Sequence, residues 1–457
     1  MKAIKHLTLE EQEAKRERRR KRSNIISPLL YILLSFLVII MTGFALLATP
    51  WASSDPKQGL APIDALFVSV SAVCVTGLSP VVLAESLSLF GKIIVGIEIQ
   101  IGGLGILTIA ASVVFITGRK INVNQAIVMK EALSQSGFGH MKKLIYHILI
   151  ITFVFEAIGT ALSYLVFRND FAPAEAFGIS LFHAVSAFNN AGFDIIGNTS
   201  LIAYKDNVLL NLVTCALIIA GGLGFLVFED IINYRKFRKF PTQTKIVLIM
   251  TTIILVISTL LNYLIGHDKM TFLQSFFYSV NLRTAGFTTF DNVNTLSRAG
   301  VIASIFFMFI GGSPVSTAGG IKTTTFFVIL LSFHSFVHGK KAVAFKREIS
   351  AFTRNKAFMV AFLFLALILV GSTAISLFEN NAYPLEFLMY EATSALCTVG
   401  FTMGITPLLS IGSKLILCLL MFTGRVGPIM MLTSWNPNLY HVKKSDVDYL
   451  EADVMIG

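Results

Sequence analysis

The sequence predicts an all-α polytopic membrane protein with four membrane–pore-helix–membrane repeats around a pseudo-fourfold pore, that is, eight spans plus four re-entrant helices. Three observations support this prediction: the apolar composition, eight apolar stretches of bilayer-crossing length, and four similar short peptides between them. Of the 457 residues, 54% are hydrophobic and only 14% are charged, and the mean hydropathy is +0.74. A soluble fold of this length could not bury so much apolar surface behind so few charges. The chain therefore uses lipid as part of its solvent.

The eight apolar stretches are each long enough to cross a bilayer as a helix. The segments on one side of these stretches carry 27 of the 37 Lys and Arg residues, and the segments on the other side carry seven. By the positive-inside rule, we expect a multi-pass protein of the plasma membrane with both termini in the cytoplasm. The stretches are residues 25–49, 90–117, 144–167, 207–232, 246–266, 301–336, 357–378 and 415–435.

Between each odd and even span lies a shorter apolar stretch. A helix of about 12 to 15 residues covers about 20 Å, which is less than the hydrocarbon core of a bilayer. We therefore expect four re-entrant helices rather than four more spans. Their ranges are 61–74, 174–188, 271–282 and 384–397.

Each short helix is followed by a small peptide that ends in glycine. Backbone outside a helix is tolerated at membrane depth only where protein buries it or water fills a cavity, so the four peptides are expected to meet around one axis. Rings of backbone carbonyls can replace the hydration shell of an alkali cation, and glycine allows an ion to approach the chain closely. The absence of acidic side chains from the peptides suits a monovalent ion better than Ca²⁺. The predicted ion-binding filter residues are Val75, Thr76, Gly77, Asn190, Ala191, Gly192, Thr284, Ala285, Gly286, Thr398, Val399 and Gly400.

A second glycine follows each peptide at a nearly constant spacing of 24 to 29 residues. Span, half-helix, glycine peptide and span therefore recur four times, which is an internal repeat. For the four glycines that end the short peptides, the alternative interpretation is that they only allow close packing of helices. The second glycines are Gly102, Gly221, Gly311 and Gly424.

The second span of the third repeat contains a break at residues 311–320, which include four glycines and a proline. Because no continuous helix tolerates that composition cheaply, we expect two half-helices around an intramembrane loop just below the filter. A kink that only relieves packing is the alternative. The predicted gate residues are Gly311, Gly312, Ser313, Pro314, Thr317, Gly319, Gly320, Lys322 and Arg425.

Three basic residues lie within apolar segments. Arg425 occupies the equivalent point of the fourth repeat, where a positive charge must face a partner or water and would raise the barrier to a cation. Snorkelling or helix capping is the alternative for Arg425, and Lys322 either anchors the loop or snorkels. Arg283 precedes the third filter peptide, and we expect it to point behind the filter toward a carboxylate. The candidate carboxylates are Glu98, Glu156, Asp194 and Glu391.

This arrangement resembles the Trk/Ktr/HKT superfamily of potassium transporters over almost the whole chain, from about residue 25 onward. With eight spans and no additional leading helix pair, the sequence is most similar to the KtrB-type membrane subunits of bacteria. The resemblance implies sodium-stimulated potassium uptake by a homodimer seated on a cytosolic ring of nucleotide-binding KtrA-type subunits. K⁺ would be the transported ion and Na⁺ an activator. The resemblance also implies gating by the intramembrane loop and by Arg425.

The predicted organisation follows the repeats. The basic cytoplasmic faces suit anionic lipids, and no nucleic-acid partner or bound cofactor is expected. The segments are a basic cytoplasmic N-terminus (1–24), repeat 1 (25–117), repeat 2 (144–233), repeat 3 (246–337) with the loop 311–320, repeat 4 (357–435) and a cytoplasmic C-terminal tail (436–457).

An enzyme is not predicted, because the sequence has no zincin, nucleophile-elbow or P-loop motif. No metal site is expected beyond the transported K⁺ or Na⁺. The serious alternative is a secondary transporter of another cation or small solute, with a broken-helix site at the membrane midplane. That class favours inverted halves, whereas the four units here run in one direction, so a pore is the preferred interpretation.

Overall fold

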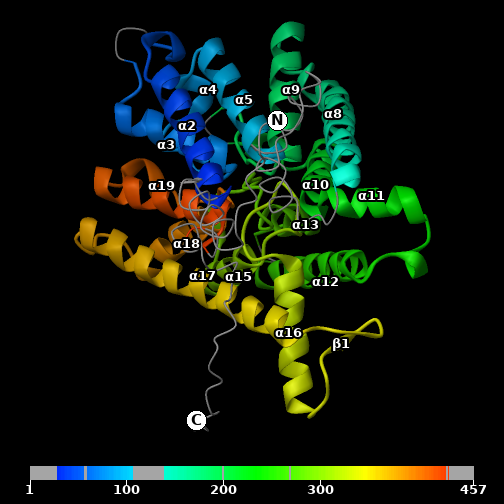
Figure 1. Cartoon of the computed structure of the whole chain (residues 1–457). Helices are drawn as coiled ribbons and strands as arrows, with labels where there is room; N and C mark the ends of the chain where they lie inside the picture. Colours follow the sequence, from blue (N-terminus) through cyan, green and yellow to red (C-terminus); the bar gives the residue numbers. More distant parts are fainter. Residues whose placement is uncertain are drawn as a thin grey trace, which may run out of the picture.

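The computed structural model of the chain is mostly helical. It describes residues 28–55, 59–105, 138–197, 200–266, 269–428 and 431. Figure 1 shows the helices arranged around a central region that contains much of the non-helical chain. The predicted cytoplasmic segments 1–24 and 436–457 lie outside the described residues.

In the first half of the chain, long apolar helices alternate with shorter ones. The elements are α2 (Pro28–Leu47), η1 (Pro50–Ala52), α3 (Pro62–Cys74), α4 (Leu83–Ser86), α5 (Leu89–Leu104), α8 (Phe138–Phe167), α9 (Pro173–Phe188), η2 (Ile202–Tyr204), α10 (Val208–Leu223) and α11 (Phe225–Tyr234).

The second half repeats the alternation and adds one small hairpin. The elements are η3 (Phe237–Lys239), α12 (Thr242–Ile265), α13 (Phe272–Asn281), α14 (Asn292–Thr295), α15 (Arg298–Phe309), α16 (Thr323–Val337), β1 (Val343–Ala344), β2 (Arg347–Glu348), α17 (Ala351–Phe378), α18 (Leu385–Leu396), η4 (Thr406–Leu408) and α19 (Ile411–Val426).

Four short helices, α3, α9, α13 and α18, lie in the stretches where half-helices are expected. Pro62 and Pro173 open α3 and α9, at a position where proline removes no helical hydrogen bond. Thr271 begins α13 with a capping box, because its hydroxyl accepts from the Gln274 amide at 3.2 Å and the Gln274 side chain accepts from the Thr271 amide. The last turns of all four helices are buried, so these helices point into the protein.

Among the described residues, three helices are long and apolar enough to cross a membrane on their own: Leu144–Phe167 within α8, α12 and α17. α10 and α11 pass the same test only as a pair, and they are bent by 88°. The other apolar helices of the described chain are shorter than a full span, as in α15 and α16, which lie on either side of the loop 311–320. Large apolar side chains such as Leu264 and Phe362 are about 70% exposed, as expected for surfaces that face lipid.

The stretch 207–232, for which the sequence predicts one span, consists of the bent helix pair α10 and α11. Gly224 separates α10 from α11 and has a φ of +92°, a conformation that side-chain-bearing residues rarely adopt. A Cβ at this position would lie 2.6 Å from the carbonyl oxygen of Pro314, and the amide of Phe225 donates to the carbonyl of Val315 at 2.9 Å. The bend therefore makes room for the loop of the third repeat, a long-range contact that apolar patterning does not reveal.

The chain is not purely helical, because β1 and β2, which have two residues each, form an antiparallel hairpin between α16 and α17 (Figure 1). Its turn places Phe345 and Lys346 at positive φ. The sequence analysis missed this hairpin because the turn lacks the Asn-Gly or Asp-Gly pair that usually marks such a geometry.

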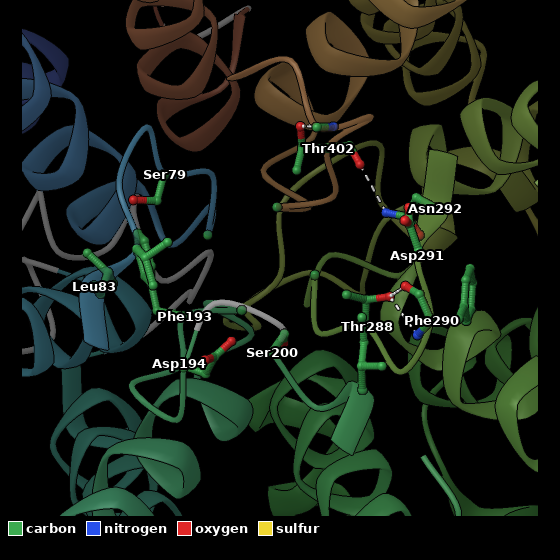
Figure 2. A pocket seen from close by; sticks show the side chains of 18 of the residues that line it. Ser79, Leu83, Phe193, Asp194, Ser200, Thr288, Phe290, Asp291, Asn292 and Thr402 are labelled. Carbon is green, nitrogen blue, oxygen red and sulfur yellow. Dashed lines mark hydrogen bonds between the residues drawn. The ribbon is translucent and has the colours of Figure 1, made fainter. Parts of the chain in front are cut away.

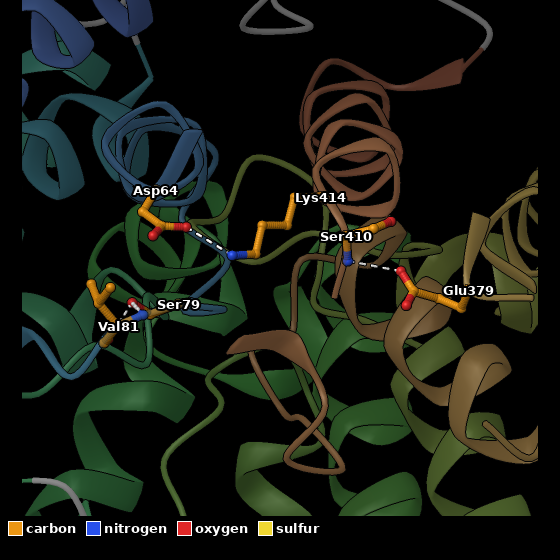
Figure 3. A network of polar contacts seen from close by, with 6 residues as sticks. All are labelled: Asp64, Ser79, Val81, Glu379, Ser410 and Lys414. Atoms are coloured by element: carbon orange, nitrogen blue, oxygen red, sulfur yellow. Dashed lines mark hydrogen bonds and ion pairs between the residues drawn. The ribbon is translucent and has the colours of Figure 1, made fainter. Parts of the chain in front are cut away.

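A buried ion pair joins the first and fourth repeats on one side of the protein (Figure 3). Asp64, in the first turn of α3, accepts from the Lys414 ammonium of α19 at 2.9 Å, and both side chains are less than 20% exposed. Nearby, the carboxylate of Glu379 caps the start of α19 by accepting from the Ser410 amide at 2.8 Å. The Asp64–Lys414 pair joins α3 to α19 through residues that are 350 positions apart in the chain.

Breaking the buried ion pair is expected to destabilise the fold. Lys414→Met leaves the Asp64 carboxylate buried without its partner, which costs about 3 kcal/mol. We expect the thermal midpoint of the detergent-purified protein to fall by several degrees. The matched control is Lys341→Met in the hairpin, where the pair with Glu348 is 77% and 56% exposed and contributes less than about 1 kcal/mol. Equal midpoints for the two variants would contradict this ranking.

Candidate functional site

The four glycine peptides share one backbone conformation. In each, the residue two positions before the glycine has a positive φ of between 53° and 72°, and the glycine itself has a φ of between 72° and 95°. Val75, Thr284 and Thr398 are β-branched, so this conformation strains them by about 1–3 kcal/mol each. The fourth of these residues is Asn190, which tolerates positive φ better. Strain of this kind persists only where the surroundings impose it, which is typical of a functional site.

The four glycines form a closed ring. A Cβ built on each glycine would lie within 2.5 Å of the carbonyl oxygen that precedes the glycine of the next peptide. The peptides follow one another around the ring in chain order, and the fourth contacts the first. Because real Cβ atoms do not come so close to backbone, only glycine fits at these positions. The glycine-to-oxygen pairs are Gly77 with Ala191 (2.3 Å), Gly192 with Ala285 (2.2 Å), Gly286 with Val399 (2.5 Å) and Gly400 with Thr76 (2.4 Å).

The backbone amides beside the ring bond back to the short helices. Within the described chain, the four ring carbonyls accept no hydrogen bond, so they remain available to a ligand. Ser71 and Ser394 reinforce the turn, because their hydroxyls accept from the amides of Gly77 and Gly400 at 3.1 Å. The amide-to-carbonyl pairs are Thr76 with Ser71, Ala191 with Ser186 and Val399 with Ser394 (2.8 Å each), and Ala285 with Asn281 (3.0 Å).

All four ring glycines line one cavity of about 420 Å³ (Figure 2). Asp194, Thr288, Asp291 and Thr402 also line it, so polar side chains form part of the cavity wall. Burial raises the pKa of Asp194 to about 6, against hydrogen bonds to the Ser200 side chain and to nearby backbone amides. The carboxylate is therefore charged at neutral pH and loses its charge as the pH falls through 6. A cation approaching the ring from this side passes oxygen atoms and negative charge.

The loop 311–320 is non-helical and lies against the second repeat. α15 ends at Phe309 and α16 begins at Thr323. The amides of Ser313 and Thr317 donate to the carbonyls of Gly222 and Gly221, at 3.0 Å and 3.3 Å. Ser313 and Thr317 are themselves completely buried. Through these residues the loop packs against the end of α10 in the interior.

The loop contacts two peptides on opposite sides of the ring. The Thr317 hydroxyl donates to the Asn190 side-chain oxygen of the second peptide at 2.9 Å and lies 3.3 Å from the Phe188 carbonyl. At its other end, a Cβ on Gly319 would lie 2.0 Å from the Thr398 hydroxyl of the fourth peptide. Because the second and fourth peptides are across the ring from each other, the loop must cross beneath the ring.

Arg425 clamps this loop to the first repeat. Its guanidinium donates to the carbonyl of Thr317 in the loop and to the carbonyls of Gly102 and Gly103 at the end of α5. The Lys322 ammonium donates to the Ala318 carbonyl at 2.7 Å, within the loop itself. A cavity of about 280 Å³, lined by both residues, lies beside the loop. Within the described chain, no carboxylate pairs with either cation, so backbone carbonyls are their partners.

The second glycine of three repeats packs against its own short helix. Cβ atoms on Gly102, Gly221 and Gly424 would lie about 2 Å from the last-turn carbonyl oxygens of α3, α9 and α18. Gly311 differs, because it contacts the Gly319 carbonyl instead. In the third repeat, the loop occupies the place that a helix takes in the other repeats.

The prediction that Arg283 points toward a carboxylate partner is wrong. The Arg283 guanidinium has only Thr251 of α12 as a hydrogen-bond partner in the described chain, at 3.4 Å, and its Nε has none. All four candidate carboxylates are described, and none lies within 4.0 Å of the Arg283 side chain. They hydrogen-bond elsewhere: Glu98 with Ser69, Glu156 with Asn189, Asp194 with Ile196, and Glu391 with Thr402, Met403 and Thr406.

Sequence reasoning missed the contact that joins the ring of glycine peptides to the loop 311–320. The Asn190 side chain accepts the hydrogen bond from Thr317. The other three peptides carry valine or threonine at the equivalent position, and this difference in residue type was the only sequence signal of a separate role for Asn190. The buried network of Gln100, Glu156 and Asn189 behind the second peptide was also missed. No spacing rule connects residues on three different helices.

Comparison with known proteins bears on both family and fold. A family model described as a cation transport protein, TrkH, matches residues 36–437. The potassium/sodium uptake protein NtpJ of Enterococcus hirae is 37% identical over 456 residues, with 97% of this chain and 99% of that protein covered. The Ktr system potassium uptake protein B of Bacillus subtilis is 34% identical over 437 residues, with 93% and 95% covered. The solved structure of the potassium transporter TrkH from Vibrio parahaemolyticus has a TM-score of 0.65 at 18% identity, covering 88% of this chain and 85% of that one, and supports the fold.

Proposed function

We propose that this chain, which belongs to the TrkH family of cation transport proteins, carries potassium into the cell across the plasma membrane through the ring of its four glycine peptides. The observation that supports this proposal is the closed ring itself, whose carbonyls lack hydrogen-bond donors in the described chain and whose four glycines line one cavity. Carbonyls in such a ring replace the water that an alkali cation loses on entering. The four units form the repeats 25–117, 144–233, 246–337 and 357–435.

The preference for a monovalent ion follows from the type of ligand. Each ring position offers a neutral dipole, and the negative ends of the four short helices point toward it. Ca²⁺ is held by six to eight oxygens, usually with several carboxylates, which the ring peptides lack. K⁺ loses its hydration shell more readily than Ca²⁺ does, so a ring of carbonyl dipoles is sufficient to replace that shell.

The loop 311–320 is the gate of this pathway. It crosses beneath the ring and is held there by Thr317 and by the Arg425 clamp. An ion leaving the ring inward meets both the loop and the positive charge of Arg425, which raises the barrier to conduction. The described conformation is therefore closed, and conduction requires the loop to leave the axis.

Regulation follows the family resemblance. One relative is named a potassium/sodium uptake protein, and we infer from the family resemblance that Na⁺ stimulates uptake by this chain. Another relative is named as part of the Ktr system, which supports an assembly of several components. We accordingly infer a homodimer seated on a KtrA-type cytosolic ring that binds nucleotides. The basic cytoplasmic loops, including the exposed Lys340 and Lys346 beside the hairpin, face anionic lipid or that partner.

Ion flux into proteoliposomes tests the transport proposal. The purified full-length chain is reconstituted, and uptake of K⁺, Na⁺ and a neutral solute of similar size is compared. We expect K⁺ to enter, Na⁺ to enter more slowly and the neutral solute to be excluded. Equal flux of the neutral solute, or flux that depends on a second coupled ion, would instead favour a secondary transporter with a midplane site.

A further inference from the structure

Arg283 is a buried charge that the proposed transport pathway does not use. The residue is 6% exposed, and within the described chain its side chain makes one hydrogen bond, the long one to Thr251. An arginine does not lose its proton in proteins, so the guanidinium is a fixed positive charge. A buried charge without an opposite charge is costly to the fold, and natural proteins keep such groups mainly at functional sites.

The position of Arg283 in the chain places this charge at the ring. Arg283 follows the end of α13 and directly precedes Thr284, the residue of positive φ in the third peptide. The backbone carbonyl oxygen of Arg283 lies 3.5 Å from the side-chain nitrogen (Nδ2) of Asn190 in the second peptide. The guanidinium points the other way, toward α12, so it stands behind the third peptide rather than in the path.

The equivalent positions in the other repeats carry no charge. They are Cys74, Asn189 and Cys397. The carboxyl end of a helix has a partial negative charge, which attracts a cation, and a positive charge placed there cancels the attraction. Arg283 thus offsets the partial negative charge at the carboxyl end of α13, whereas no such positive charge stands at the equivalent positions after α3, α9 and α18.

We propose that the positive charge of Arg283 makes the ring discriminate against divalent cations. With this charge present, the ring binds divalent cations more weakly, relative to K⁺, than the geometry of its carbonyls alone would dictate. The reason is that the repulsion between a fixed charge and an ion is proportional to the charge of the ion. A unit charge on the order of 10 Å away, at an effective dielectric constant of about 20, changes monovalent occupancy about tenfold and divalent occupancy about a hundredfold. Discrimination between the two classes of ion therefore changes about tenfold.

This inference rests on the proposed potassium transport, and Ba²⁺ is a suitable probe because it has nearly the radius of K⁺ with twice the charge. K⁺ flux into proteoliposomes is measured against external Ba²⁺ for the wild-type chain and for Arg283→Met, Arg283→Gln and Arg283→Lys. We expect the neutral variants to lower the half-inhibiting Ba²⁺ concentration about tenfold more than they lower KM for K⁺. Arg283→Lys, which keeps the charge, is expected to match the wild type.

The control is Arg298→Met, which removes an arginine whose side chain is 93% exposed and should leave Ba²⁺ inhibition unchanged. Equal shifts for K⁺ and Ba²⁺ would overturn the proposal, as would an Arg283→Lys variant that behaves like Arg283→Met. If both neutral variants fail to fold, Arg283 is a packing residue and the proposal is wrong. Absence of K⁺ flux in the wild type would instead contradict the transport function itself.

Discussion

Gly286→Ser is expected to reduce K⁺ uptake at least tenfold and to remove the preference for K⁺ over Na⁺. A Cβ at this position would lie 2.5 Å from the Val399 carbonyl oxygen and 3.0 Å from the Gly400 Cα, so the fourth peptide must move. The φ of +79° adds strain for any residue with a side chain. Overpacking alone costs about 1–3 kcal/mol, and displaced carbonyls no longer fit the dehydrated ion. Uptake of both ions by the reconstituted chain measures the effect.

The matched control is Gly178→Ser, in the middle of α9. A Cβ on Gly178 meets nothing within 4 Å, and no positive φ is required there. We expect this variant to transport and select ions as the wild type does. If Gly286→Ser folds, with a thermal midpoint close to that of the control, and still prefers K⁺, then the ring does not select the ion.

The short helices show how much of this fold could be read from the sequence. Their expected ranges agree with α3, α9, α13 and α18 to within about two residues, because length, apolarity and a terminal glycine are local signals. The break at 311–320 is equally local, since glycine and proline stop a helix wherever it packs. These predictions depended only on residues that are close together in the sequence.

Features that depend on distant contacts could not be read in the same way. The 88° bend at Gly224 exists because the loop of another repeat lies against it. The partner of Arg283 was expected to be a carboxylate because buried charges are usually paired, yet all four candidates hydrogen-bond with other groups. The sequence showed which residues are costly to bury, but only the fold shows which of them meet.

Arg425→Ala is expected to raise K⁺ uptake by about tenfold or more. The guanidinium donates to the Thr317 carbonyl of the loop and to the Gly102 carbonyl of α5, and so joins the two elements. A hydrogen bond from a charged group contributes about 1.5–3 kcal/mol, so losing two of them shifts the loop substantially toward its open arrangement. Removal of the positive charge lowers the barrier further. Maximal uptake velocity in proteoliposomes, compared at equal protein density, is the measurement.

Two variants separate the clamp from the charge. Arg425→Lys keeps the charge but cannot reach both carbonyls with one ammonium, so an intermediate velocity is expected if the clamp matters most. Lys322→Met removes a contact made within the loop, the bond to the Ala318 carbonyl, and should have a smaller effect. If Arg425→Ala folds but transports no faster than the wild type, the loop is not held closed by this residue. If Arg425→Lys equals the wild type, the charge rather than the clamp controls the barrier, because only the charge is common to both side chains.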